Sequence, residues 1–138
     1  MRHILIIDNE SDVREAMQRA LSGPDMLVAT AADAEQGLAH LRTAATDLII
    51  CEIMLPGLDG PAAIAEITRQ YPDIGIIAMT GGGLGGVDRY RPDAIVTRAY
   101  LEAARHAGAH AVLAKPFAIR QLRALIRQVL DCVPAQVA

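Results

Sequence analysis

Five polar side chains follow short apolar runs at four well-separated points of the chain. Asp8 and Asn9 close the run that begins at residue 3, and Glu52, Thr80 and Lys115 follow the runs over residues 47–51, 74–79 and 110–114. Oxygen atoms such as those of Asp8 and Asn9 suit a hard cation like Mg²⁺, whereas a carboxylate such as Glu52 suits an ammonium group. These positions are therefore candidates for one functional site.

The segments around these residues predict strands that alternate with helices. Strands are expected over residues 3–8, 26–30, 47–51, 74–79 and 110–114. Asp33, with Gln36 three residues on, has the pattern of a capping box at a helix start. Helices are expected to begin near Ser11, Asp33, Gly60 and Asp93, and a last one carries Leu122, Leu125, Ile126, Val129 and Leu130 on one face.

The strict alternation and the nearly continuous apolar strands indicate an α/β fold with a doubly wound parallel sheet covered by helices on both faces. Right-handed crossovers place the carboxyl ends of such strands along one edge of the sheet, where ligands and chemistry usually lie. We therefore expect Asp8, Asn9, Glu52, Thr80 and Lys115 to converge there.

The bulk composition predicts one ordinary globular domain. With 138 residues, 52% of them hydrophobic, the chain has the length of a single core, and we expect a domain over residues 1–132, a short tail over 133–138 and no output domain. The net charge of −3 gives no electrostatic reason to expect nucleic acid or an anionic membrane as a partner. No signal peptide or spanning run is present, so we expect a cytoplasmic protein whose two cysteines, Cys51 and Cys132, form no disulfide.

The sequence around these residues resembles the receiver domain of bacterial two-component response regulators. Its landmarks occur in order along nearly the whole chain, as residues 4–8, 53–60, 79–80, 108–109 and 115–117. The resemblance implies a flavodoxin-like, CheY-like fold with strand order 2-1-3-4-5 and no enzyme activity of its own. It also implies an aspartate phosphoacceptor after the third strand, two acids that hold Mg²⁺, a hydroxyl and a lysine that contact the phosphoryl group, and a mobile aromatic on the fifth strand.

Asp8, Thr80 and Lys115 match this pattern, but Glu52 stands at the phosphoacceptor position, Asn9 at the second acid and Val112 at the switch aromatic. Glu52 places its carboxylate roughly 1.5 Å further out than an aspartate would. Displacement by about 1 Å can slow an in-line transfer on the order of 10²-fold. Mg²⁺ is expected to bind Asp8, Asn9 and Glu52 weakly or not at all, because the Asn9 amide is neutral.

The glycine-rich segment over residues 81–86 formally fits the dinucleotide fingerprint, but it follows the fourth strand instead of the first. A loop that contacts a protein partner through Arg89, Tyr90 and Arg91 is the favoured interpretation.

We thus expect a stand-alone, degenerate receiver that acts through protein–protein contact in a phosphorelay, with Glu52 as a partial phosphate mimic. Its partner would be a histidine kinase or another signalling protein, and a homodimer is left open. Two alternatives also stay open. One is a receiver phosphorylated on Glu52, and the other is a small nucleotide-binding or Mg²⁺-dependent phosphatase-like enzyme that uses Asp8 and the glycine segment.

Overall fold

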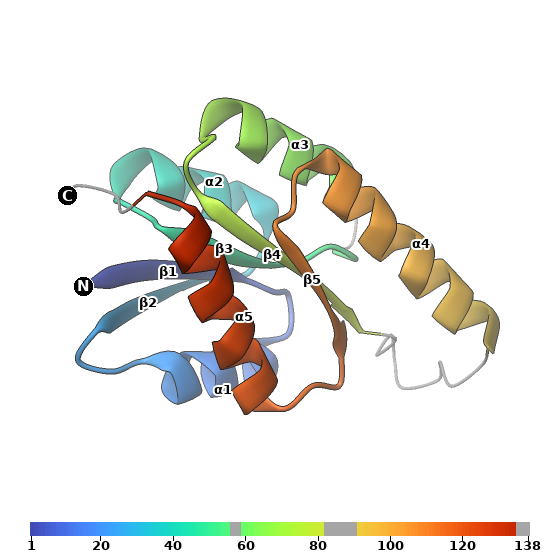
Figure 1. Cartoon of the computed structure of the whole chain (residues 1–138), viewed down its shortest axis with the longest axis horizontal. Helices are drawn as coiled ribbons and strands as arrows, with labels where there is room; N and C mark the ends of the chain where they lie inside the picture. The colour runs from blue at the N-terminus through green and yellow to red at the C-terminus, as the bar shows by residue number, and fades with distance from the viewer. Residues whose placement is uncertain (56–58, 82–90, 135–138) are drawn as a thin grey trace.

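The computed structural model describes residues 1–55, 59–81 and 91–134, with the backbone alone for residues 81 and 91–97. Strands and helices alternate along the chain (Figure 1). The strands are β1 (Arg2–Ile7), β2 (Met26–Ala31), β3 (Leu48–Glu52), β4 (Gly75–Gly81) and β5 (Ala111–Lys115). The helices are α1 (Ser11–Leu21), α2 (Ala34–Thr43), α3 (Gly60–Gln70), α4 (Arg91–Ala107) and α5 (Ile119–Cys132).

The five strands form one sheet in the order β2-β1-β3-β4-β5, and every neighbouring pair is parallel. This arrangement confirms the predicted flavodoxin-like receiver fold. All five strand ends therefore point the same way, and Asp8 just after β1, Glu52 at the end of β3 and Lys115 at the end of β5 are brought to one edge of the sheet.

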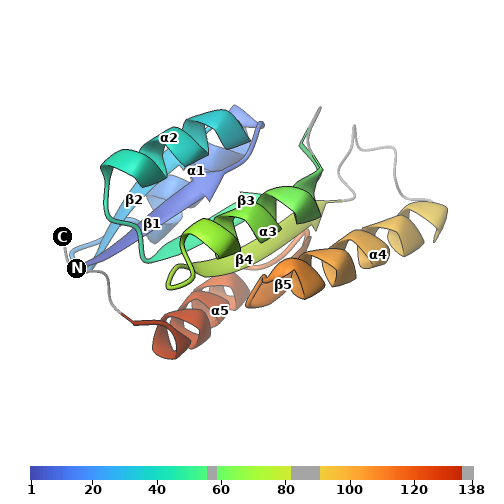
Figure 2. The same cartoon turned by 90° about the horizontal axis from the view of Figure 1, so that it is seen from above.

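The sheet separates two apolar layers because successive side chains of a strand point to opposite faces. Ile4 and Ile6 of β1 pack on the side of α1 and α5, whereas Leu5 and Ile7 pack on the side of α2, α3 and α4. Figures 1 and 2 show these helices on the two sides of the sheet. Both faces of the central strands are covered, which explains their almost uninterrupted apolar sequence.

Local capping agrees with the sequence at the start of α2. The Asp33 side chain accepts a hydrogen bond from the Gln36 backbone N–H at 2.8 Å, and the Gln36 side chain accepts one from the Ala32 backbone N–H at 2.9 Å. The Asp33 carboxylate thus satisfies one of the free backbone donors of the first turn of α2.

The predicted strand boundaries are shifted by one or two residues, and the differences that matter most are at β4 and α4. β4 continues through Thr80 to Gly81, because backbone pairing with Ala114 and Lys115 of β5 extends that far. α4 begins at Arg91, so Asp93 lies inside the helix and not at its N-cap. Pro92 does not prevent this earlier start, since a proline in the first turn loses no intrahelical hydrogen bond.

None of the helices in the described ranges combines the length and apolar character that a membrane span requires.

Gly60, the first residue of α3, lies against the backbone of the segment that follows β3. A Cβ atom at this position would overlap the Ile53 carbonyl oxygen and would lie 2.7 Å from the Ile53 Cβ. Ile53 is itself fully buried. The close approach of α3 to the end of β3 therefore requires a residue without a side chain.

We predict that Gly60→Ala lowers the free energy of unfolding by about 1–3 kcal/mol, because overpacking outweighs the better helix propensity of alanine. Urea denaturation measures this change. Gly23→Ala is the matched control, since a Cβ there meets nothing within 4 Å, and its effect should stay within about 0.5 kcal/mol. Equal effects of the two substitutions would contradict the steric explanation.

Candidate functional site

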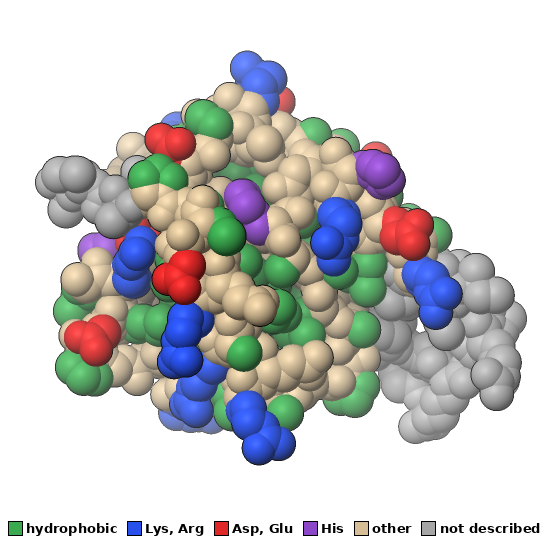
Figure 3. All heavy atoms as spheres, viewed as in Figure 1, with side chains coloured by type: hydrophobic (Ala, Val, Ile, Leu, Met, Phe, Trp, Pro, Cys, Tyr) green, Lys and Arg blue, Asp and Glu red, His purple; other side chains and the backbone are tan. Residues whose placement is uncertain are grey.

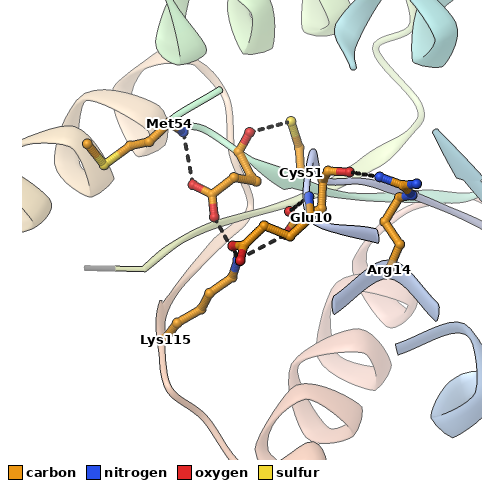
Figure 4. A network of polar contacts seen from close by, with 7 residues as sticks. Glu10, Arg14, Cys51, Met54 and Lys115 are labelled. Carbon is orange, nitrogen blue, oxygen red and sulfur yellow. Dashed lines mark hydrogen bonds and ion pairs between the residues drawn. The ribbon is translucent and has the colours of Figure 1, made fainter. Parts of the chain in front are cut away.

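Lys115 lies between two buried carboxylates at the carboxyl edge of the sheet. Its Nζ atom is 2.9 Å from Asp8 Oδ2 and 2.9 Å from Glu52 Oε1. The Glu10 carboxylate lies further out, with its Oε1 atom 3.9 Å from the same nitrogen. Lys115 is also the only lysine in the chain. The centre of the site is thus one ammonium group shared by acids from β3 and from the end of β1 (Figure 4).

The register of the sheet explains why these three side chains meet. Ile7 of β1 pairs with Cys51 of β3, so Asp8 and Glu52 occupy the next positions of adjacent strands. By strand alternation Asp8, Glu52 and Lys115 share the sheet face on which α1 and α5 pack. Their convergence follows from strand ends that are far apart in sequence, as predicted.

Each carboxylate oxygen of the buried pair has a donor or a cation within reach. Asp8 Oδ1 accepts a hydrogen bond from the Glu10 backbone N–H at 2.9 Å, and Glu52 Oε2 accepts one from the Met54 backbone N–H at 2.9 Å. The Arg14 guanidinium donates to the Asp8 carbonyl oxygen at 2.7 Å (Figure 4). Backbone and side-chain donors therefore hold both acids in one orientation while their other oxygens face Lys115.

Burial and charge act in opposite directions on Lys115. Burial is the largest single influence on the pKa of Lys115 and tends to lower it, but the hydrogen bonds and negative charges of Glu52 and Asp8 together outweigh it and raise the pKa above the usual lysine value. Asp8 is fully buried and Glu52 is 5% exposed. Buried charges of this kind are tolerated only when they are paired.

Thr80 reaches the same edge but takes no part in the ion cluster. Met79 packs on the α1 and α5 side, so Thr80, the next residue of β4, faces the other side of the sheet. Its Oγ1 atom is buried and has no hydrogen-bond partner in the described part of the chain. The hydroxyl is therefore close to the site in sequence register, yet unbonded.

The other predicted residues are placed less centrally. Asn9 is exposed at the surface, while Val112 is partly buried against the apolar layer of α2, α3 and α4. Arg89 and Tyr90, with most of the glycine-rich segment, lie outside the described residues, and of Arg91 only the backbone is described.

The donor set does not offer Mg²⁺ an open site in this arrangement. The space between Asp8 and Glu52 is taken by the Lys115 ammonium, and their remaining oxygens accept backbone hydrogen bonds. Over residues 1–55, 59–81 and 91–134, no group of three or more His, Cys, Asp or Glu side chains is arranged to hold a metal ion. A cation ligated by both acids would have to displace Lys115.

Sequence reasoning missed several members of the site. One is Glu10, the residue before α1, whose side chain makes no capping hydrogen bond and lies near Lys115. The role of Arg14 follows from its position one turn into α1, where its side chain reaches back to the end of β1. Backbone donors such as Met54 N–H leave no signal in side-chain patterns.

Cys51 is a buried thiol directly beside the acidic pair. Both cysteines are free, as expected, with Cys51 buried and Cys132 exposed. Cys51 Sγ donates to the Glu52 carbonyl oxygen at 3.4 Å. Burial, reinforced by the charges of Glu52 and Asp8, raises the pKa of Cys51 to about 12. The thiolate is the reactive form of cysteine, so this thiol is protected from chemistry at neutral pH.

Several known proteins are similar to this chain in sequence or in fold. The model of the response regulator receiver domain family matches residues 4–88. A probable transcriptional regulator, ycf27, of Cyanidium caldarium is 34% identical over 128 residues, which cover 93% of this chain and 46% of that protein. The transcriptional regulatory protein AfsQ1 of Streptomyces coelicolor is 35% identical over 130 residues, which cover 94% of this chain and 52% of AfsQ1.

Among solved structures, the receiver domain of NtrX from Brucella abortus superposes with a TM-score of 0.78 at 28% identity, covering 93% of this chain and 98% of that domain. This chain therefore spans a whole solved receiver domain but only about half, or less, of the curated regulators it matches.

We predict that Lys115→Met lowers the free energy of unfolding at neutral pH by about 3–5 kcal/mol, because it leaves two buried carboxylates without a cation. The unfolded lysine titrates near pH 10.4, and the folded pKa is higher. The contribution of the ammonium is therefore complete below about pH 10.4 and is lost as the pH rises through the folded pKa. Urea denaturation at several pH values measures both effects.

The exposed pair Arg69–Glu66 provides the control, and Arg69→Met should have a much smaller effect, because solvent screens an exposed ion pair. The single lysine also gives one side-chain signal in a lysine-labelled NMR sample, so its titration can be followed directly. A midpoint at or below the ordinary lysine value would refute the ion cluster.

We predict that a thiol reagent at about pH 8 modifies only Cys132 in the folded protein, since a thiol whose pKa is about 12 is almost entirely protonated there. Cys132→Ser should abolish prompt labelling, and Cys51→Ser should leave it unchanged. Prompt modification of both thiols before unfolding would show that Cys51 is accessible.

Proposed function

Because this chain belongs to the response regulator receiver domain family, we propose that it acts as an atypical receiver in phosphorelay signalling, through contact with a protein partner and without turning over phosphate. One observation carries the proposal. Glu52, at the phosphoacceptor position, already reaches Lys115 at 2.9 Å. The contact that the family pattern assigns to a phosphoryl oxygen is thus made by a carboxylate.

Glu52 serves in this proposal as a partial phosphate mimic. A phosphoaspartate carries nearly two negative charges and three acceptor oxygens, whereas a glutamate carries one charge and two oxygens. The contacts of Glu52 fit this difference, because it pairs with Lys115 while the Thr80 hydroxyl has no partner among the described residues. In this proposal, Glu52 reproduces the contact of a phosphoryl group with Lys115 but not its contact with the Thr80 hydroxyl.

The same contacts disfavour phosphorylation of Glu52. Attack on a phosphodonor needs a free carboxylate oxygen in line with the phosphorus atom. Both oxygens of Glu52 are engaged, one by Lys115 and one by the Met54 backbone N–H. Releasing either oxygen would cost a buried, charge-assisted contact.

Weak or absent Mg²⁺ binding belongs to the same proposal. Phosphoryl transfer relies on a metal ion to neutralise the developing charge. Asn9 supplies no negative charge, and Asp8 is held by Lys115. The ammonium group therefore takes over the charge balance of this site, with no requirement for a metal in the resting domain.

The partner we propose is a histidine kinase or another signalling protein, and the family resemblance points to α4, β5 and α5 as the contact surface. Tyr100 of α4 is among the few large apolar side chains exposed in the described part of the chain, at 39%. Aromatic side chains of this kind often anchor protein contacts. Val112 stands in place of the mobile aromatic residue of β5, so this surface would present a single conformation to its partner. The net charge of −3 gives no electrostatic reason to expect nucleic acid as a partner.

We predict that the wild-type chain, incubated with Mg²⁺ and acetyl phosphate, shows no added phosphate by intact mass spectrometry. The Asn9→Asp, Glu52→Asp double variant is the matched comparison and should gain an adduct, because it restores the second acid and the shorter acceptor. A stoichiometric adduct mapped to Glu52 in the wild-type protein would instead establish the alternative of a phosphorylatable receiver.

A further inference from the structure

A pocket lies at the amino edge of the sheet, at the end opposite to the ion cluster of Asp8, Glu52 and Lys115. It has a volume of about 300 Å³ and lies between the end of α1, the first residues of β1 and β2, and one side of α5. Strand β1 separates the two sites, and its six residues span about 20 Å. The apolar part of the pocket is formed by Leu21, Met26 and Leu130.

Three arginines surround this apolar floor. Arg123 and Arg127 lie four residues apart on α5, and therefore on one side of the helix, and Arg2 stands at the start of β1. The Arg123 guanidinium donates to the Ala20 carbonyl oxygen at 2.7 Å, which fixes one guanidinium beside α1. Arg127 is exposed and makes no ion pair with any residue that the structure describes.

Arg2 pairs with Asp47 but keeps one buried nitrogen atom without a hydrogen bond in the described part of the chain. Its Nη1 atom is buried and has no hydrogen-bond partner within the described ranges, although Asp47 Oδ1 lies 3.8 Å away. A buried guanidinium nitrogen without a hydrogen bond is costly, so an acceptor in the pocket would relieve an existing deficit.

The pocket is positive although the chain is negative. Among the described residues, Asp131 lines the pocket and Asp47 pairs with Arg2, so the three arginines still leave one positive charge in surplus, in a chain of net charge −3. In Figure 3, basic side chains gather along and beside α5 on the face toward the viewer. This local concentration of arginine is therefore a feature of the site and not of the composition.

We propose that this pocket binds a small organic anion with a carboxylate head and an apolar body. Guanidinium groups recognise carboxylates through paired, charge-assisted hydrogen bonds, and Leu21, Met26 and Leu130 supply a floor for the apolar part. A volume of about 300 Å³ is at the lower end for small-molecule sites. The occupant is thus a compact molecule that unites both features.

Hexanoate is a suitable probe, because it has a carboxylate on a short apolar chain. Titrated into the whole chain, it should cause saturable shifts of the methyl NMR signals of Leu21, Met26 and Leu130. Acetate, which has the head without the body, should bind more weakly, and hexylammonium, which has the body with the opposite charge, should not bind.

Arg127→Gln should weaken hexanoate binding about tenfold, the cost of one lost charge-assisted hydrogen bond. Arg123→Gln provides a second test if the first variant is poorly folded. Arg120→Gln is the matched control, because Arg120 is exposed on the same helix but does not line the pocket, and it should leave binding unchanged. Glu52→Gln should also leave it unchanged, so this test is independent of the function proposed for the acidic site.

Four results would overturn the proposal. The first is that hexanoate causes no saturable shifts. The second and third are that acetate binds as tightly as hexanoate without shifting the methyl signals, or that hexylammonium binds as tightly as hexanoate. The fourth is that an acidic peptide binds and hexanoate does not. The last result would assign the surface to a protein partner instead of a small ligand.

Discussion

The carboxyl edge of the sheet depends on one electrostatic constraint, which is that two buried carboxylates must share a single cation. Asp8 and Glu52 come from adjacent strands and would repel each other without Lys115, whose Nζ atom lies 2.9 Å from each. Removing charges from water costs several kcal/mol per ion, and only close pairing with further hydrogen bonds offsets that cost. The positions of the β1 and β5 ends, and the backbone donors of Glu10 and Met54, can all be understood as meeting this requirement.

Glu52 differs from an aspartate in the length of its side chain and not in its charge, so the extra methylene group accounts for the changed contacts at this edge of the sheet. With its longer side chain, Glu52 contacts the Lys115 ammonium of β5 directly. Under the proposed function, the additional negative group that a typical receiver gains by phosphorylation would be replaced by a permanent glutamate side chain. The signalling activity of such a domain would not depend on phosphorylation. It would be controlled by the concentration of the protein and by the partner that it contacts.

The sequence was sufficient for the architecture but not for the side-chain environment at the strand ends. Apolar runs on strands covered by two helical layers are distinctive, and so the sheet and its functional edge could be predicted. Within a strand, successive side chains lie on opposite faces of the sheet, so an error of one position reverses the predicted face. The face of a polar residue at a strand end can therefore be predicted only when the last residue of the strand is known. Thr80 was expected beyond β4 and instead lies within it. The proximity of Glu10 to Lys115, at 3.9 Å, depends on where β5 ends relative to β1 and therefore leaves no pattern in the sequence.

The chain holds a single lysine, and that lysine carries the ion cluster. Every other side-chain cation, histidines aside, is a guanidinium, which enzymes that acylate amines do not modify. Within this chain, acylation of a side-chain amine can therefore occur only where it would neutralise the cation between Asp8 and Glu52, and the 16% exposure of that side chain restricts access to it. The surface is consequently almost inert to lysine-directed modification, while the one sensitive amine is shielded by the carboxylates it stabilises.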